Sequence, residues 1–96
     1  MVTKADLQAR RDEILALASK RGARNIRVFG SVARGQARAD SDIDFLVDMD
    51  EGRSLLDLSG LLIDLESLLN IRVDVVTESG LSPHLRDRIL NEATPL

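Results

Sequence analysis

Hydrophobic and polar residues follow two different periods along this chain, and the two periods predict helices and strands in turn. Apolar residues at helical spacing predict helices over residues 4–21, 55–69 and 83–93, and residues 31–35 fit one further helical turn. Alternating or short apolar runs predict three strands, over residues 25–29, 42–47 and 71–76. The predicted order is therefore helix, strand, short helix, strand, helix, strand, helix.

Polar residues at the predicted helix starts agree with these bounds. The pairs Thr3–Asp6 and Ser54–Asp57 have the spacing of a capping box. Ser82 followed by Pro83 is a favoured helix start, with serine as the cap and proline in the first turn. We therefore expect a single domain over residues 1–96, of the α/β (α+β) class, with a small mixed sheet of about three strands flanked by helices.

The leucines of the predicted helix 55–69 form a stripe that is wider than one core-facing side requires. The first interpretation is that this stripe belongs to the hydrophobic core. The second is that part of it binds another protein, because exposed apolar patches mark interfaces. The sequence leaves both roles open for this helix.

Composition argues against several classes of function. The chain has two Phe and no Trp or Tyr, so few rings are present on which the bases of single-stranded nucleic acid could stack. Its net charge of −3 does not provide the positive surface of a general DNA-binding protein. It has no Cys, no apolar run of the ~20 residues that span a bilayer, and no signal-peptide core. We expect a cytoplasmic protein with neither nucleic acid nor membrane as a direct partner.

Two aspartates fall on the second predicted strand, inside an apolar run. Asp42 and Asp44 alternate with Ile43 and Phe45, so both carboxylates should face the same side of the strand. Unpaired carboxylates at that spacing raise each other's pKa, and a divalent cation removes the conflict. Mg²⁺ prefers such oxygen ligands together with waters and substrate phosphates. The alternative is a solvated face whose acids keep an edge strand soluble.

A third aspartate, Asp74, lies on the third predicted strand and alternates with Val73 and Val75. A carboxylate in the middle of such a strand needs a cation or a hydrogen-bonding partner. A salt bridge to Arg72 or Arg27 would meet that need. If the second and third strands are neighbours, Asp74 instead converges with the other two aspartates, and the three carboxylates fit two-metal phosphoryl transfer.

A phosphate-binding turn is predicted at Gly30 and Ser31, directly after the first strand and before the short helical turn. Free N–H groups and a hydroxyl at a helix start can bind phosphate, and glycine lets the backbone approach closely. Gly-Ser is also common in ordinary loops, and the glycine spacing matches neither a Walker loop nor a dinucleotide fingerprint. These residues by themselves predict a metal- and phosphate-binding α/β domain.

The stretch GSVARGQARADSDIDFLV resembles the signature of the polymerase-beta-type nucleotidyltransferases, in which Gly-Ser precedes Asp-x-Asp inside an apolar strand. It is closest in wording to the small prokaryotic branch, the minimal nucleotidyltransferases (MNT). The stretch VDVVTESGLSPHLRDRILNEATPL resembles the end of that family, so the resemblance covers nearly the whole chain. It implies the nucleotidyltransferase fold and a reaction in which an acceptor attacks the α-phosphate of a nucleoside triphosphate and pyrophosphate leaves.

The resemblance also implies a role for each candidate metal ligand. Asp42 and Asp44 would each bind both of two Mg²⁺ ions. Asp74 would be the third carboxylate, which binds the catalytic ion and helps to activate the acceptor hydroxyl. All three acids are present, so the resemblance implies an active enzyme.

Three further residues would bind the nucleotide. Gly30 and Ser31 would hold the phosphates of ATP, as the resemblance implies. Arg34 would contact phosphate as well, or alternatively form a salt bridge to Asp40 or Asp42.

The resemblance finally implies a partner protein. Larger relatives carry extra domains that bind the acceptor, whereas little of this chain follows Asp74, so we expect another protein to supply the missing surface. In the family that partner is a HEPN-domain ribonuclease toxin, and the MNT protein is the antitoxin that transfers AMP from ATP to a tyrosine of the toxin. Two alternatives stay open: nucleotidyl transfer to a small molecule, and a non-catalytic antitoxin that blocks its toxin by binding.

Overall fold

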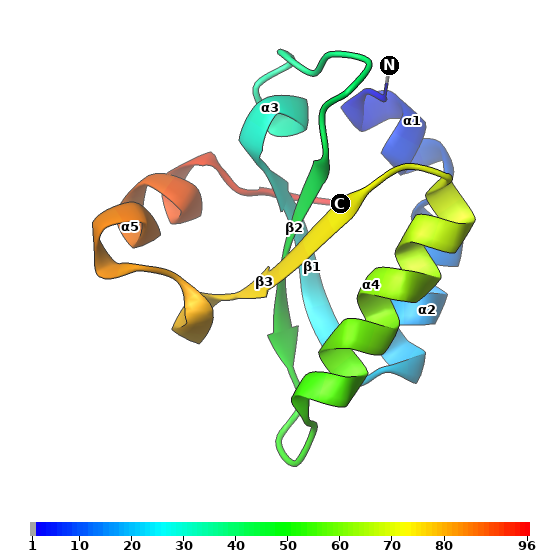
Figure 1. The fold of residues 1–96 in the computed structure, drawn as a ribbon, viewed down its shortest axis with the longest axis vertical. Helices are drawn as coiled ribbons and strands as arrows, with labels where there is room; N and C mark the ends of the chain where they lie inside the picture. The colour runs from blue at the N-terminus through cyan, green and yellow to red at the C-terminus, as the bar shows by residue number, and fades with distance from the viewer. Residues whose placement is uncertain (1) are drawn as a thin grey trace.

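The computed structural model describes residues 2–96, which form a mixed sheet with helices on both sides (Figure 1). The elements in chain order are α1 (Lys4–Ala9), α2 (Arg11–Lys20), β1 (Ala23–Phe29), α3 (Gly30–Ala33), β2 (Ile43–Met49), α4 (Leu55–Leu69), β3 (Val73–Thr77), the 3-10 turn η1 (Glu78–Gly80), α5 (Pro83–Glu92) and β4 (Thr94–Pro95). The fold class and the order of the main elements agree with the prediction.

The sheet has the strand order β3-β2-β1-β4 and contains both kinds of pairing. β2 runs parallel to β3, whereas β1 runs antiparallel to both β2 and β4. The sequence predicts about three strands, and the structure has a fourth, β4, which pairs with Arg27 and Val28. Because β4 has only two residues, it shows no alternation by which a sequence pattern could reveal it.

One face of the sheet carries the hydrophobic core, and α2 and α4 pack against it. Its buried side chains include Ile14, Ala18, Val28, Ile43, Phe45, Val47, Leu61, Leu65, Val73 and Val75. The opposite face is covered less completely, because α5 lies on that side and contains no buried residue (Figure 1). The two faces therefore differ in kind: one is filled by helices, and the other remains partly accessible.

The first predicted helix, over residues 4–21, is broken in the structure. α1 ends at Ala9 and α2 begins at Arg11, because Arg10 leaves the helical conformation (φ −112°, ψ 17°). The Arg10 guanidinium donates a hydrogen bond to the carbonyl of Leu68 at 2.9 Å, near the end of α4. Arg10 and Leu68 are far apart in the sequence, and no Gly or Pro near residue 10 marks the break.

The predicted helix starts are confirmed at two of three places. Thr3 and Ser54 both form complete capping boxes, with Asp6 and Asp57 respectively. Pro83 lies in the first turn of α5 as predicted, but the side chain of the preceding serine makes no capping hydrogen bond. The start of α5 is therefore the least firmly held of the three.

The leucine stripe of α4 divides between two environments. Leu61 and Leu65 are buried in the core, whereas Leu55 and Leu56 in the first turn are 80% and 82% exposed. The stripe is therefore not a continuous core face, and Leu55 belongs to the surface. Even α4 falls short of a membrane-spanning helix, and no other helix within residues 2–96 is long and apolar enough to cross a bilayer.

Replacement of Phe45 tests whether the buried core, and not the exposed apolar side chains, stabilises the fold. Phe45→Ala should cost about 3–5 kcal/mol in the free energy of unfolding, because a fully buried ring leaves a cavity. Ile63→Ala, at a position that is 60% exposed, should change it by less than about 0.5 kcal/mol. Urea denaturation measures both, and equal costs would contradict this account of the core.

Candidate active site

The parallel pairing of β2 with β3 places Asp44 directly opposite Asp74. The condition that these strands are neighbours is therefore met, and the strands of a sheet lie about 4.8 Å apart. Val73 and Val75 are buried on the core side, so Asp74 and its partner Asp44 face the other side. Asp42, two residues before Asp44 and just outside β2, lies on the same side by alternation.

The glycine turn meets the acids at Asp44. Phe29, the last residue of β1, pairs across the sheet with Asp44, and Gly30 follows with a φ of +76°. A Cβ atom added to Gly30 would lie 2.1 Å from Oδ2 of Asp44, so only glycine fits there. Gly30 and Ser31 begin the short helix α3, which the sequence predicts at residues 31–35. The turn and the carboxylates are thus one continuous surface.

Asp44 is the most perturbed carboxylate of this surface. It is partly buried, and Leu46, two residues further along the same side, is fully buried. Burial raises the pKa of Asp44 to about 6, with further contributions from the negative charges of Asp74, Asp42 and Glu92, while Arg34 acts in the opposite direction. The raised pKa reflects acids crowded together at a partly desolvated position.

The ion pairs expected for Asp74 do not form. Arg72 lies 3.3 Å from Oδ1 of Asp42, and Arg27 lies 2.9 Å from Oδ1 of Asp48. Both candidate partners are thus bound to other acids, and Asp74 takes part in none of the salt bridges found within residues 2–96. The salt-bridge interpretation of Asp74 is therefore wrong, and its exposed carboxylate faces Asp44.

Arg34 forms an ion pair that the sequence did not indicate. Its guanidinium pairs with Glu92 at the end of α5, so the alternative of a salt bridge to Asp40 or Asp42 is wrong. Glu92 also accepts a hydrogen bond from the backbone N–H of Gly30 at 3.3 Å. The ion pair of Arg34 with Glu92 joins residues 58 positions apart in the chain, and only the return of α5 to the turn creates it.

The three aspartates are chemically suited to bind Mg²⁺, although they do not form a complete coordination site by themselves. No group of three or more His, Cys, Asp or Glu side chains in the described part of the chain is positioned to hold a metal ion as it stands. Asp42, Asp44 and Asp74 nevertheless offer the hard oxygen ligands that Mg²⁺ prefers, and it commonly keeps waters and substrate phosphates beside one or two carboxylates. A divalent cation would also relieve the crowding that raises the pKa of Asp44.

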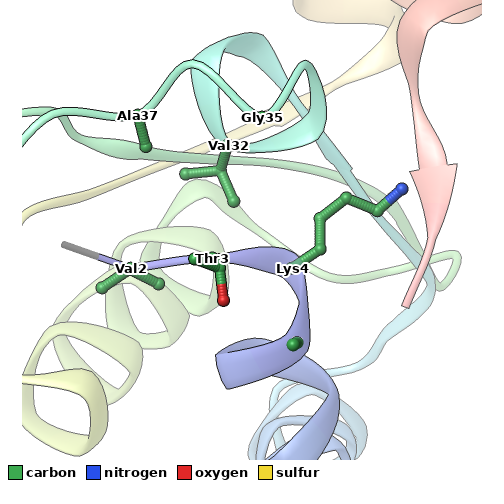
Figure 2. A pocket seen from close by; sticks show the side chains of 7 residues that line it. Val2, Thr3, Lys4, Val32, Gly35 and Ala37 are labelled. Carbon is green, nitrogen blue, oxygen red and sulfur yellow. The ribbon is translucent and has the colours of Figure 1, made fainter.

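An apolar pocket lies beside α3, at the start of α1 (Figure 2). It has a volume of about 310 Å³ and is formed between the residues around the start of α1 and those of α3 and the following loop. Val2 and Ala37 lie on opposite walls of the pocket, and Val32 of α3 lies between them. None of the predicted site residues lines this pocket, so it is separate from the acidic surface.

The mixed sheet, with helices on both sides and a glycine turn beside its acids, has the fold of the nucleotidyltransferase class. Residues 12–96 match the family described as nucleotidyltransferase domain, and the chain belongs to this family. The sequence resemblance is therefore confirmed, and the protein is a transferase by family.

Several relatives support this assignment. The chain is 48% identical over 71 residues to the protein adenylyltransferase MntA of Thermococcus cleftensis, covering 74% of this chain and 72% of the relative. It is 47% identical over 81 residues to a Methanocaldococcus jannaschii protein provisionally named a protein adenylyltransferase, covering 84% and 87%. A solved structure described provisionally as a minimal nucleotidyltransferase superposes with a TM-score of 0.87 at 54% identity, over 99% of this chain and 97% of the other.

More distant solved structures share the fold. A toxin–antitoxin complex with AMP-PNP contains a chain that matches with a TM-score of 0.74 at 24% identity, over 88% of this chain and 69% of the other. A tri-AMPylated HEPN toxin of Shewanella oneidensis in complex with its MNT antitoxin gives a TM-score of 0.68 at 22% identity, over 92% and 68%. At these identities the likeness concerns the fold.

Replacement of Gly30 tests its contact with Asp44. Gly30→Ala should cost about 1–3 kcal/mol in the free energy of unfolding, because the residue has a positive φ and its new Cβ would strike the carboxylate. Gly35→Ala is the matched control, since its φ is +71° but a Cβ there meets nothing within 4 Å. Urea denaturation of both variants gives the difference due to Asp44, and equal costs would show that the close approach is unimportant.

Removal of the Asp44 charge tests the crowding of the acids. The pKa of Asp44 in the folded protein is about 6, above its ordinary 3.8, so the folded state binds more protons in that interval and stability falls as the pH rises through it. Asp44→Asn should therefore raise the Tm of the metal-free protein at neutral pH by about 3 °C or more, and the gain should vanish below pH 3.8.

The control for this measurement is Asp42→Asn, because Asp42 is exposed and already paired with Arg72. It should change the Tm less than Asp44→Asn does. An unchanged or lower Tm for Asp44→Asn at neutral pH, recorded by scanning calorimetry, would contradict the crowding.

Proposed function

We propose that this protein is a Mg²⁺-dependent protein adenylyltransferase that transfers AMP from ATP to a tyrosine of a cognate HEPN-domain ribonuclease toxin, and that it thereby acts as the antitoxin. Three findings support the proposal: membership of the nucleotidyltransferase domain family, relatives named protein adenylyltransferases, and fold neighbours solved as complexes of HEPN toxins with MNT antitoxins. We place the reaction in the cytoplasm, where ATP and such a toxin would meet.

The observation that carries the proposal is the pairing of Asp44 with Asp74 beside Gly30. Nucleotidyl transfer needs carboxylates that hold metal ions at the triphosphate, together with backbone groups that bind its phosphates. In this chain both kinds of group meet at Asp44. A pure binding protein has no need of several crowded acids, which lower its own stability.

Each residue has a part in this proposal. Asp42 and Asp44 would hold two Mg²⁺ ions, Asp74 would hold the catalytic one of the two, and Gly30 and Ser31 would bind the phosphates. When bound, Mg²⁺ neutralises charge on the triphosphate and lowers the pKa of the attacking hydroxyl. Arg34 belongs to the same group, because its guanidinium shares an oxyanion partner with the N–H of Gly30.

In the proposed reaction, pyrophosphate is displaced from the α-phosphorus by an in-line attack. The tyrosine oxygen forms a bond to the α-phosphorus while the bond from that phosphorus to the bridging oxygen of the β-phosphate breaks. Pyrophosphate leaves with the electron pair, and the phenolic proton passes to Asp74 or to water, because Asp74 is exposed and takes part in no salt bridge within residues 2–96. The added AMP would place bulk and negative charge where the toxin must bind RNA phosphates.

The test mixes the purified protein with a candidate cognate HEPN-domain protein, Mg²⁺ and α-labelled ATP. We expect label on a tyrosine of the toxin, no transfer without Mg²⁺, and a loss of about 100-fold or more in Asp44→Asn. Asp48→Asn is the matched control: Asp48 lies on the same strand and the same side but pairs with Arg27, so this variant should retain transfer.

Other outcomes separate the alternatives. If label appears only on a small molecule, that molecule and not the toxin is the acceptor, and the reaction is still nucleotidyl transfer. A toxin that is inhibited without label, equally by the wild type and by Asp44→Asn, would make the protein a non-catalytic antitoxin. Either result overturns the proposed function as stated.

A further inference from the structure

Glu92, at the end of α5, binds the two groups that are proposed to bind phosphate, Gly30 and Arg34. One of its carboxylate oxygens accepts the N–H of Gly30 at 3.3 Å, and the other pairs with the guanidinium of Arg34. Only 15% of the Glu92 side chain is exposed, against 39% for Arg34. The carboxylate is therefore largely enclosed, although charged side chains at helix ends are usually exposed to solvent.

A carboxylate and a phosphate are alike in the interactions that matter here. Both are oxyanions that accept hydrogen bonds from backbone N–H groups and pair with guanidinium. Gly30 has a single N–H hydrogen, so it cannot donate a full hydrogen bond to Glu92 and to a phosphate together. A phosphate that takes the N–H of Gly30 must therefore replace Glu92.

We propose that Glu92 is an internal competitor for the nucleotide, which occupies Gly30 and Arg34 in the nucleotide-free protein and is displaced when the triphosphate binds. This inference rests on the proposed function, because it takes Gly30 and Arg34 as phosphate-binding groups. It adds a regulatory contact to that site and couples nucleotide binding to the position of α5.

α5 itself contributes no buried side chain to the core, whereas β4, which follows it, is held by its pairing with β1. Within α5, Leu85 is 47% exposed. Between α5 and the turn lies a small hollow of about 180 Å³, lined in part by Phe29 and Ile89. Glu92 is thus a principal tie between α5 and the turn, and its release leaves the packing of α2 and α4 against the sheet intact.

The first measurement compares nucleotide affinity by calorimetry, with Mg²⁺ and a non-hydrolysable ATP analogue. A competitor that occupies its groups about four-fifths of the time weakens the apparent affinity about five-fold. Glu92→Gln removes the charge and keeps the shape, so it should bind the analogue about five-fold more tightly than the wild type. Glu78→Gln is the matched control: it removes the same charge from an acid that pairs with Arg86, and its affinity should stay at the wild-type value.

The second measurement begins with the wild type, and that part does not depend on whether the variant folds. Hydrogen exchange of the backbone amides of α5 should become faster when the analogue binds, because Glu92 is displaced. In Glu92→Gln the same amides should exchange faster already without nucleotide.

The outcomes distinguish this inference from the proposed function. If the wild type binds the analogue but Glu92→Gln binds it equally or more weakly, Glu92 is not a competitor, and the proposed function is untouched. Equal tightening in Glu92→Gln and Glu78→Gln, or slower exchange of α5 with nucleotide, also overturns the inference. If neither protein binds the analogue, the inference and the proposed function both fall.

Discussion

The candidate site depends on one strand pairing, the parallel register of β2 with β3. That register sets Asp44 against Asp74 on one side and leaves Phe45, Val73 and Val75 on the other. A shift by a single residue would turn the apolar side chains to solvent and the acids into the core. Because burial of each apolar side chain is worth about 1.5–3 kcal/mol, the core face holds the register against the repulsion between the acids.

The side chains that stabilise the fold and those of the candidate site therefore lie on opposite faces of the sheet. The face that packs against α2 and α4 supplies the hydrophobic burial. The other face holds a partly buried carboxylate with a raised pKa, which lowers stability, next to a glycine whose Cβ would strike that carboxylate. Such features persist only where the surrounding structure fixes them. Here they lie together at Asp44 and Gly30, which is why that surface, and not the apolar pocket beside α1, is the candidate for function.

Much of this could be predicted from the sequence because it depends on neighbours in the chain. The alternation around Asp44 and Asp74 fixes which side each residue faces, and both capping boxes depend on residues three apart. The break at Arg10, the strand β4 and the position of Glu92 depend instead on contacts between distant segments. The ion pairs were also unpredictable, because the many arginines and acids of this chain allow several pairings that only the three-dimensional structure decides.

The short helix α3 is supported from two directions. It has four residues, too few to be stable by itself. It faces the residues around the start of α1 across the apolar pocket (Figure 2), and Gly30 and Arg34 are tied to Glu92 at the end of α5. Segments near both ends of the chain therefore lie beside the helix that begins at Gly30, whereas the three aspartates come from the middle of the chain.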